Sequence, residues 1–243
     1  MSENAVADKP LDGRIALVTG ASRGIGAATA KSLAAAGAHV ILTGRKVKAL
    51  EAVEDAIHDA DGSSTIAPLD LTDGDSIGRL AQAIAERWDR LDILVINAAM
   101  LPTLTPVTQI DGKQFNEAMT LNVLATQALL AVFDPLLKRS PNGRILGLTS
   151  SVGANPRAFW GAYGATKAAF DNLLLSHGHE IGRISETRVA IIDPGATRTA
   201  MRERAYPGED PQTVKSPEVV GSRIVSLLEE DFDNLHRERV EIS

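Results

Sequence analysis

The stretch R-I-A-L-V-T-G-A-S-R-G-I-G, from Arg14 to Gly26, indicates how this chain folds. It begins with an apolar run typical of a buried strand and ends where a helical pattern starts. The glycines between them lack the Cβ atoms that would block a tight bend and the approach of a pyrophosphate. A pyrophosphate there would lie at the N-terminus of the helix, where backbone N–H groups are free. We expect this turn to bind a dinucleotide through Gly20, Ser22, Arg23, Gly24, Ile25 and Gly26.

The rest of the chain repeats this alternation of short apolar runs and longer helical patterns. Further strands are expected at 38–43, 65–69, 92–97, 144–149 and 188–193, and helices near 25–36, 46–60, 74–88, 108–139 and 161–184. Near-continuous apolar strands are typical of a parallel sheet covered on both faces. The sequence therefore predicts an α/β fold with a doubly wound, mostly parallel sheet of the Rossmann type, in three α/β/α layers. Ligands bind such sheets at the carboxyl ends of the strands.

Length and composition agree with one domain. The chain has 243 residues, 44% of them hydrophobic, and no shift in composition or linker divides it. Residues 1–12 form a short polar leader without the basic and apolar regions of a signal peptide, so the domain is expected over 13–243. No later apolar run approaches the roughly 20 residues that a bilayer span needs. A membrane partner is therefore not expected.

The net charge and the absence of cysteine exclude further classes of partner and site. A net charge of −6 and a pI near 5.4 argue against nucleic acid, which needs a basic face. The absence of cysteine excludes disulfides, thiol nucleophiles and Cys-ligated metals, and it fits a reducing, cytoplasmic location. His177 and His179 have no third ligand at sensible spacing, so no metal site is expected.

The end of the second expected strand favours NADP(H) over NAD(H). NAD binders carry an acidic side chain here, which accepts hydrogen bonds from the ribose hydroxyls. This strand ends T-G-R-K, with Gly44 in place of the acid and Arg45 beside it. A guanidinium binds a 2′-phosphate through paired hydrogen bonds, and Arg23 could contact the same phosphate from the glycine turn. The alternative is that both arginines are solvated loop residues.

Residues that follow the third and fourth strands are further candidates for the cofactor site. Asp70, with Leu71 beside it, could accept a hydrogen bond from the adenine amino group. Alternatively, Asp70 or Thr72 caps the helix that follows. Asn97 is expected mainly to join neighbouring strand ends through its amide and only secondarily to line the cofactor site. The small Ala98 lets the backbone pass beneath the cofactor.

The segment from Ser150 to Lys167 carries the expected chemistry. Tyr163 and Lys167 are four residues apart, so on a helix they lie on one face, a turn from each other. A phenol has a pKa of about 10, and a nearby positive charge lowers that pKa by stabilising phenolate. Ser150, at the end of a strand, could hold a substrate oxygen opposite Tyr163. The alternative is a solvated pair on a helix surface.

Asn122 stands in an otherwise apolar helical stretch, T-L-N-V-L-A-T. Asparagine is unfavourable inside a helix unless its amide is used, because it competes with the backbone for hydrogen bonds. One use is a local kink that frees a carbonyl to hold a water near Lys167. The alternative is a polar residue on the helix surface.

These motifs together resemble the short-chain dehydrogenase/reductase family, in its single-domain branch, over nearly all of residues 11–230. The glycine turn has the T-G-x-x-x-G-x-G form, Tyr163 and Lys167 form Y-x-x-x-K, and N-A-A at 97–99 is similar to the family's N-A-G. The family's catalytic tetrad falls on Asn122, Ser150, Tyr163 and Lys167, and its P-G-x-x-x-T element on Pro194, Gly195 and Thr199. Ala99 replaces the usual glycine. A last strand, common in the family, is expected over 239–242.

The resemblance implies a role for each tetrad residue. Tyr163 would be the general acid in reduction and the base in oxidation. Ser150 would orient and polarise the carbonyl. Lys167 would hold the nicotinamide ribose hydroxyls and lower the tyrosine pKa, and Asn122 would anchor a proton-relay water. The resemblance also implies cofactor contacts from Tyr163, Lys167, Pro194, Gly195, Thr197 and Thr199, with the carboxamide bound by Thr199 and the backbone near Thr197.

Substrate selection is expected in residues 100–106, 153–160 and 200–217. A polar, proline-containing lid is expected over about 196–217. Apolar contacts would come from Phe159, Trp160, Met201 and Tyr206. Arg198, Arg202 and Arg204 could meet an anionic substrate or could simply be solvated.

The leading hypothesis is an NADP(H)-dependent oxidoreductase that interconverts a small-molecule carbonyl and a secondary alcohol by hydride transfer. The alternatives are an epimerase or dehydratase with the same tetrad, and a non-catalytic dinucleotide-binding partner protein. A homo-oligomer, dimer or tetramer, is expected. The apolar face made by Ala168, Ala169, Leu173 and Leu174 could pair helices between subunits or pack on its own sheet.

Overall fold

A computed structural model describes residues 9–241, which contain a seven-stranded sheet in the order β3-β2-β1-β4-β5-β6-β7. Every neighbouring pair of strands is parallel, so the predicted parallel sheet is confirmed. The order reverses between β1 and β4, the crevice where ligands of such sheets bind. The strands are β1 (Ile15–Thr19), β2 (His39–Gly44), β3 (Ser63–Pro68), β4 (Ile93–Ile96), β5 (Arg144–Leu148), β6 (Arg188–Asp193) and β7 (His236–Arg239).

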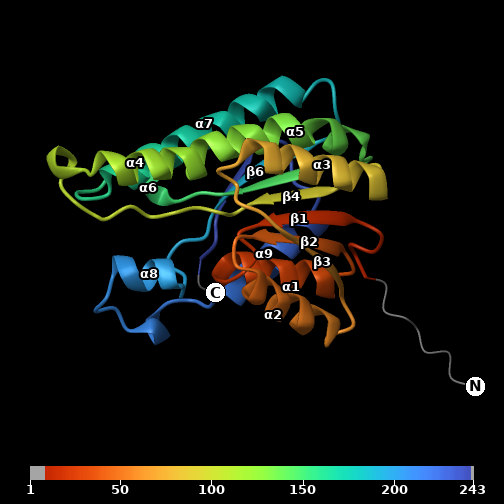
Figure 1. Ribbon diagram of the computed structural model, residues 1–243, viewed down its shortest axis with the longest axis horizontal. Helices are drawn as coiled ribbons and strands as arrows, with labels where there is room; N and C mark the ends of the chain where they lie inside the picture. The colour runs from red at the N-terminus through yellow and green to blue at the C-terminus, as the bar shows by residue number, and fades with distance from the viewer. Residues whose placement is uncertain (1–8, 242–243) are drawn as a thin grey trace, which may run out of the picture.

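Helices cover both faces of the sheet, which gives the predicted three layers (Figure 1). One face carries α1 (Gly24–Ala35), α2 (Val47–His58) and α9 (Pro217–Glu229). The other carries α3 (Gly74–Trp88), α5 (Ala125–Arg139) and α7 (Gly161–Ile181), with α4 (Gly112–Met119) continuing α5 through the π-helix η2 (Thr120–Leu124). The short elements α6 (Ser151–Ala154), α8 (Ala200–Ala205), η1 (Val107–Gln109) and η3 (Pro211–Thr213) lie in the connections.

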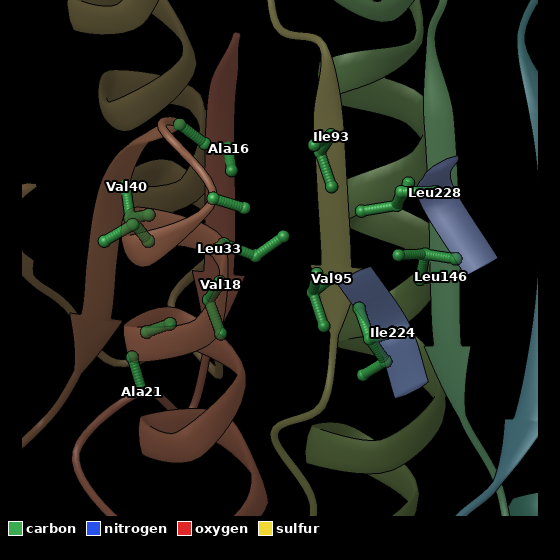
Figure 2. Close-up of a cluster of buried hydrophobic side chains, with 14 of the residues drawn as sticks. Ala16, Val18, Ala21, Leu33, Val40, Ile93, Val95, Leu146, Ile224 and Leu228 are labelled. Atoms are coloured by element: carbon green, nitrogen blue, oxygen red, sulfur yellow. The ribbon is translucent and has the colours of Figure 1, made fainter. Parts of the chain in front are cut away.

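Two apolar cores hold the layers together, one on each face of the sheet. Figure 2 shows part of the first, where Leu33 of α1 and Ile224 of α9 meet strand residues such as Val18 and Val95. Strand side chains alternate between the two faces, so each strand contributes to both cores. The cores fix the strand ends, and through them the loops at the carboxyl edge.

Three boundaries differ from the sequence expectations. Helix α9 was not predicted, although its buried residues Val220, Ile224, Leu227 and Leu228 have helical spacing and Pro217 occupies its first turn. The last strand spans His236–Arg239 rather than 239–242. The helix expected over 108–139 begins only at Gly112 and is interrupted by η2.

The start of the folded chain also differs from expectation. Leu11, placed in the polar leader, is 1% exposed and packs in the first core, and its backbone N donates to Ala36 O at 2.9 Å. Leu11 therefore packs with the domain. The leader's residues 1–8 lie outside the described part of the chain.

Gly112–Arg139 is the one helical stretch within residues 9–241 that is long and apolar enough to cross a membrane. Half of its most apolar window is buried inside the protein, which is typical of a core helix.

Candidate active site

The glycine turn joins β1 to α1 at the carboxyl edge of the sheet. Gly20 and Gly24 have positive φ angles of 66° and 55°, a region that side chains other than glycine rarely adopt. A Cβ atom at Gly26 would lie 2.3 Å from the carbonyl oxygen of Gly20. The three glycines thus allow the turn to fold tightly over the N-terminus of α1, with its free N–H groups facing the crevice.

Asn97 joins the turn to the neighbouring strand end. Its Nδ2 donates to the Thr19 carbonyl oxygen at 2.8 Å, and its backbone N donates to Thr19 Oγ1 at 2.9 Å. The hydroxyl of Thr19 donates in turn to the Val95 carbonyl oxygen. These hydrogen bonds lock the ends of β1 and β4 together beneath the crevice.

A cavity of about 480 Å³ lies along this edge, and we call it the larger cavity. Its residues come from the glycine turn, the ends of β2 to β6, η2, α7, the start of the lid and the start of α9. Most of the expected cofactor contacts line it: Gly20, Ser22, Arg23, Gly24, Ile25, Arg45, Asp70, Leu71, Asn97, Ala98, Tyr163, Lys167, Pro194 and Thr199. Ala99, which replaces the family's glycine, lines it too. Gly26, Gly195 and Thr197 do not.

The β2 end of the larger cavity is rich in cations. Arg23, Arg45 and Lys46 line it, and Gly44 contributes no carboxylate. The Arg45 side chain is 71% exposed and its Nη1 lies 3.9 Å from the carboxylate of Asp70. Such a long, exposed ion pair is weak, so Arg45 is available to a ligand.

Asp70 is engaged locally rather than as a helix cap. Its Oδ1 accepts from the backbone N and the hydroxyl of Thr72, at 3.0 and 2.8 Å. These hydrogen bonds, the backbone one foremost, lower the pKa of Asp70. The helix α3 is capped by Asp73, whose side chain accepts from the backbone N of Asp75 and Ser76. The alternative that Asp70 or Thr72 caps α3 is therefore wrong.

Tyr163 and Lys167 lie on one face of α7, and both are buried. Their residues are 7% and 2% exposed, so the alternative of a solvated surface pair is wrong. The Nζ of Lys167 donates to the Leu148 carbonyl oxygen at 2.7 Å and lies 5.9 Å from the centroid of the Tyr163 ring. The lysine is thus fixed between the end of β5 and the tyrosine.

Burial decides the protonation of this pair. It raises the pKa of Tyr163 above the ordinary value, and the charge of Asp193 acts in the same direction. Burial also lowers the pKa of Lys167 to about 8, and the carboxylate of Asp171 opposes that shift. Burial therefore opposes the lowering of the tyrosine pKa that Lys167 is expected to cause, and this effect of Lys167 stays a prediction for the protein with its cofactor bound.

Asp171 is a residue of this site that the sequence analysis missed. It follows Lys167 by one helical turn, is 7% exposed, and its Oδ2 accepts from Arg237 Nη2 of β7 at 3.1 Å. Its place four residues after Lys167 is the signal that could have identified it.

Asn122 is 1% exposed and lies within the π-helix η2, so the helix-surface alternative is wrong. Its Oδ1 accepts from the backbone N of Met100 at 2.9 Å, and its Nδ2 donates to Met100 O and Thr166 Oγ1, both at 3.0 Å. Its backbone carbonyl accepts from Thr126 Oγ1 at 3.0 Å. Asn122 therefore links three segments of the site, and π-helical turns often occur at functional sites.

Ser150 lines a second cavity, of about 180 Å³, which we call the smaller cavity. It lies at the N-terminus of α6, directly after Thr149 of the larger cavity. The boundary between the cavities also falls between Pro194 and Gly195 and between Met201 and Arg202. In each pair, the first residue lines the larger cavity and the second lines the smaller one. Ser150 and Tyr163 thus line adjoining cavities rather than the same one.

The three segments expected to select substrate come together around Tyr163. A small apolar cluster contains Leu101, Val152 and Tyr163, with Leu104, Trp160, Met201 and Ala205 packed against it. Trp160 and Tyr206 line the smaller cavity and Met201 the larger, whereas Phe159 is 57% exposed. The lid segment therefore rests on the tyrosine through α8.

The lid segment is pinned at both ends. Thr197 and Lys215 form a parallel β-bridge, and the backbone N of Arg198 donates to Lys215 O at 2.8 Å. Within it, Arg202 binds both carboxylate oxygens of Glu209, and Arg204 donates to the Leu101 carbonyl oxygen. Arg198 is exposed and lines the larger cavity.

The remaining expectations concern the outer part of α7. Leu174 is buried in the second core, Ala169 and Leu173 are half-buried, and Ala168 is exposed. His179 is exposed, but the His177 side chain is only 13% exposed and its Nε2 lies 3.4 Å from the Asp134 carboxylate. Within residues 9–241, three or more metal-ligating side chains do not gather anywhere.

Known proteins are similar to this chain in sequence. A family model described as short chain dehydrogenase matches residues 14–210. The chain is 38% identical over 224 residues to YciK of Escherichia coli (strain K12), described as an uncharacterised oxidoreductase, covering 91% of this chain and 88% of that protein.

Solved structures of similar sequence have the same fold. A short chain dehydrogenase structure from Pseudomonas syringae has a TM-score of 0.93 at 37% identity, covering 99% of this chain and 100% of that one. One from Escherichia coli CFT073, complexed with NADPH, has a TM-score of 0.91 at 35% identity, covering 97% and 99%. Since the family model spans most of the chain and these likenesses extend over nearly all of it, the chain belongs to the short-chain dehydrogenase family.

Proposed function

We propose that this protein is an NADP(H)-dependent oxidoreductase that interconverts a carbonyl and a secondary alcohol by hydride transfer, with Tyr163 as the general acid and base. One observation carries the proposal. Tyr163 and Lys167 are buried along one face of α7 on the wall of the larger cavity, to which the glycine turn also contributes. A phenol and an ammonium thus share a cavity with a turn suited to pyrophosphate.

The residues present fit a dinucleotide phosphate. The tight glycine turn leaves the N-terminus of α1 open to a pyrophosphate. Arg23 and Arg45 flank Gly44 at the far end of the cavity, where a 2′-phosphate would need cations and an acidic residue would repel it. The NADPH complex of the E. coli CFT073 relative supports NADP(H) over NAD(H). The bound nicotinamide supplies or accepts the hydride.

The chain's own residues handle the proton. The Tyr163 phenol is protonated near neutral pH and would donate its proton to the carbonyl oxygen in reduction. Lys167, with a pKa of about 8, is mostly cationic at pH 7 and would hold the ribose hydroxyls. Ser150 would polarise the substrate oxygen. Asn122 would hold the relay water, while Thr199 and the backbone near Thr197 would bind the carboxamide.

The proposal extends to the surroundings of the site. We expect a small-molecule substrate, a cytoplasmic location and a homo-oligomer, with the lid segment closing over bound substrate. The cysteine-free sequence supports the location, and the 60% exposed Leu124 and the exposed Ala168 support a subunit contact on the α5 and α7 side. Light scattering on the purified protein would test the assembly, since a monomer at micromolar concentration contradicts it.

A Tyr163→Phe variant tests the central claim. NADPH oxidation would be followed across a panel of aldehydes and ketones, and NADPH binding would be measured separately by fluorescence. We expect turnover to fall by about 10²- to 10⁴-fold with NADPH affinity unchanged, since only the acidic hydroxyl is removed. Full turnover in the variant would reject Tyr163 as the acid. A wild-type protein that binds NADPH but reduces nothing in the panel would reject the oxidoreductase.

A further inference from the structure

The smaller cavity has the size of one substrate group. Ser150, the residue proposed to hold the reacting oxygen, lies on its wall, and its volume is about 180 Å³. An apolar cavity of about 150 Å³ holds benzene. The smaller cavity therefore has room for roughly one six-membered ring or a short branched chain.

Aromatic side chains form one wall of the smaller cavity. The ring centroids of Trp160 and Tyr206 lie 5.9 Å apart, and those of Trp160 and Tyr163 lie 6.1 Å apart. Trp160 thus connects the cavity wall to the proposed acid. A flat or compact apolar group fits such a wall.

The polar part of the lining carries more positive than negative charge. Three guanidinium groups line the cavity, from Arg157, Arg202 and Arg239, against the single carboxylate of Asp193. That carboxylate is already engaged, because Oδ2 accepts from Arg239 Nη1 at 2.8 Å and Oδ1 from the Gly195 N at 2.9 Å. It is therefore a poor receptor for a cationic substrate.

Two of the three arginines are paired with glutamates that do not line the cavity. Arg202 binds Glu209, and its guanidinium lies 3.7 Å from the centroid of the Tyr206 ring. Arg239 Nε lies 2.7 Å from the Glu241 carboxylate. The glutamates neutralise the charges of Arg202 and Arg239 without lining the cavity. The two arginines therefore contribute N–H donors to the cavity but little net charge.

Arg157 differs from the other two. Among residues 9–241 no carboxylate lies within ion-pair distance of it, and its Nη2 donates to Ser151 Oγ at 3.1 Å. Ser151 directly follows Ser150, so this hydrogen bond places an unneutralised guanidinium close to the proposed reacting centre. A guanidinium recognises carboxylate and phosphate oxygens through paired hydrogen bonds.

We propose that the substrate is a compact oxo or hydroxy compound with an anionic group, which Arg157 binds in the smaller cavity. The apolar body of the substrate lies against Trp160 and Tyr206, and its reacting oxygen lies between Ser150 and Tyr163. This inference rests on the proposed function, which identifies the reacting centre, and adds the substrate class to it.

Binding of two matched probes tests the anion site without turnover. Benzoate and benzamide have the same ring and differ in charge, and each would be titrated calorimetrically into the protein saturated with NADPH. We expect benzoate to bind roughly twofold to tenfold more tightly, since Arg157 is exposed and solvent weakens its charge-assisted hydrogen bonds. Arg157→Gln should abolish this preference. Arg183→Gln, the same change at an exposed position after α7, should retain it.

A second pair of probes connects the site to catalysis. We expect 4-carboxybenzaldehyde to be reduced with a higher kcat/KM than methyl 4-formylbenzoate, by roughly tenfold or more. Arg157→Gln should raise KM for the carboxylate and leave the ester unchanged. Equal binding of benzoate and benzamide, or a preference for benzoate that survives Arg157→Gln, overturns the inference. If the ester is reduced in that case, the proposed function still holds. Tight benzoate binding without reduction of any carbonyl rejects the proposed function and leaves the anion site.

Discussion

The side-chain amide of Asn122 donates a hydrogen bond to the hydroxyl of Thr166 at 3.0 Å, and so joins the π-helix η2 to the helix that carries Tyr163 and Lys167. The same side chain binds both backbone polar groups of Met100, in the loop after β4. One amide therefore positions three segments around the site. Its loss should affect stability and turnover together.

Asn122→Ala should destabilise the protein by about 2 kcal/mol, because the half-buried backbone groups of Met100 lose their partner and Thr166 Oγ1 keeps only its hydrogen bond to the Tyr163 carbonyl oxygen. Urea unfolding measures this, and NADPH oxidation should fall at least about tenfold. Asn116→Ala, at an exposed position of α4, is the matched control and should change the free energy of unfolding by less than about 0.5 kcal/mol. Equal stability of the two variants would contradict the positioning role.

A substitution at the end of β2 should reverse the preference for NADPH over NADH. A Cβ at Gly44 has only ordinary contacts, the nearest 3.6 Å away, so Gly44→Asp fits and adds the carboxylate that ribose hydroxyls bind. NADPH affinity should fall roughly tenfold or more through repulsion of the 2′-phosphate, and NADH affinity should rise. Arg45→Gln should weaken NADPH alone, and Arg87→Gln on α3 should weaken neither. Fluorescence titrations of the three variants with NADPH and NADH measure these affinities, and a Gly44→Asp variant that still prefers NADPH would refute the assignment.

The pH dependence of NADPH binding should report Lys167. The lysine is cationic below its pKa of about 8 and neutral above it, so affinity should decline as the pH rises through that value. Asp171→Asn removes the charge that raises this pKa and leaves Arg237 uncompensated nearby, so the midpoint should move to lower pH. Dissociation constants measured from pH 6 to 10 test this. Glu180→Gln, at the exposed end of α7, should leave the midpoint in place, and an unmoved midpoint in Asp171→Asn would contradict the coupling.

The contact between α1 and α9 should not tolerate a side chain at Gly221. A Cβ there would lie 2.7 Å from Ser32 Oγ and 2.9 Å from the Ala28 carbonyl oxygen. Gly221→Ala should therefore destabilise the protein by about 1 to 3 kcal/mol through overpacking. Gly78→Ala, inside α3 with nothing within 4 Å of the new atom, should stabilise it by about 0.5 to 1 kcal/mol. Thermal unfolding compares the two, and shifts of the same sign would contradict the packing argument.

The parts of the fold that the sequence predicts are those with strong local signals. Buried strands such as β1 and β6 are continuous apolar runs, and the turn from Gly20 to Gly26 follows directly from backbone geometry. Helix α9 escaped prediction because it follows the polar lid segment and its apolar spacing is weakened by Gly221. Its identity as a core helix becomes clear only when α1 packs against it.

The candidate active site also has features that the sequence predicts and features that depend on the fold. The spacing of Tyr163 and Lys167 is a local property, and it predicts their common face. The direction of the Tyr163 pKa depends on burial, and the ion pair of Asp171 depends on Arg237 from the sheet edge, so neither can be derived from spacing. The separation of Ser150 from Tyr163 into adjoining cavities likewise arises only when the lid packs on α6 and α7.

The β-bridge between Thr197 and Lys215 brings the two ends of the lid segment together at one point of the scaffold. A loop whose ends already meet can be lengthened, shortened or exchanged without changing the gap that it must span. Grafting residues 202–214 between related enzymes should thus change the range of substrates accepted, while the lid residues that line the larger cavity, from Arg198 to Met201, stay in place.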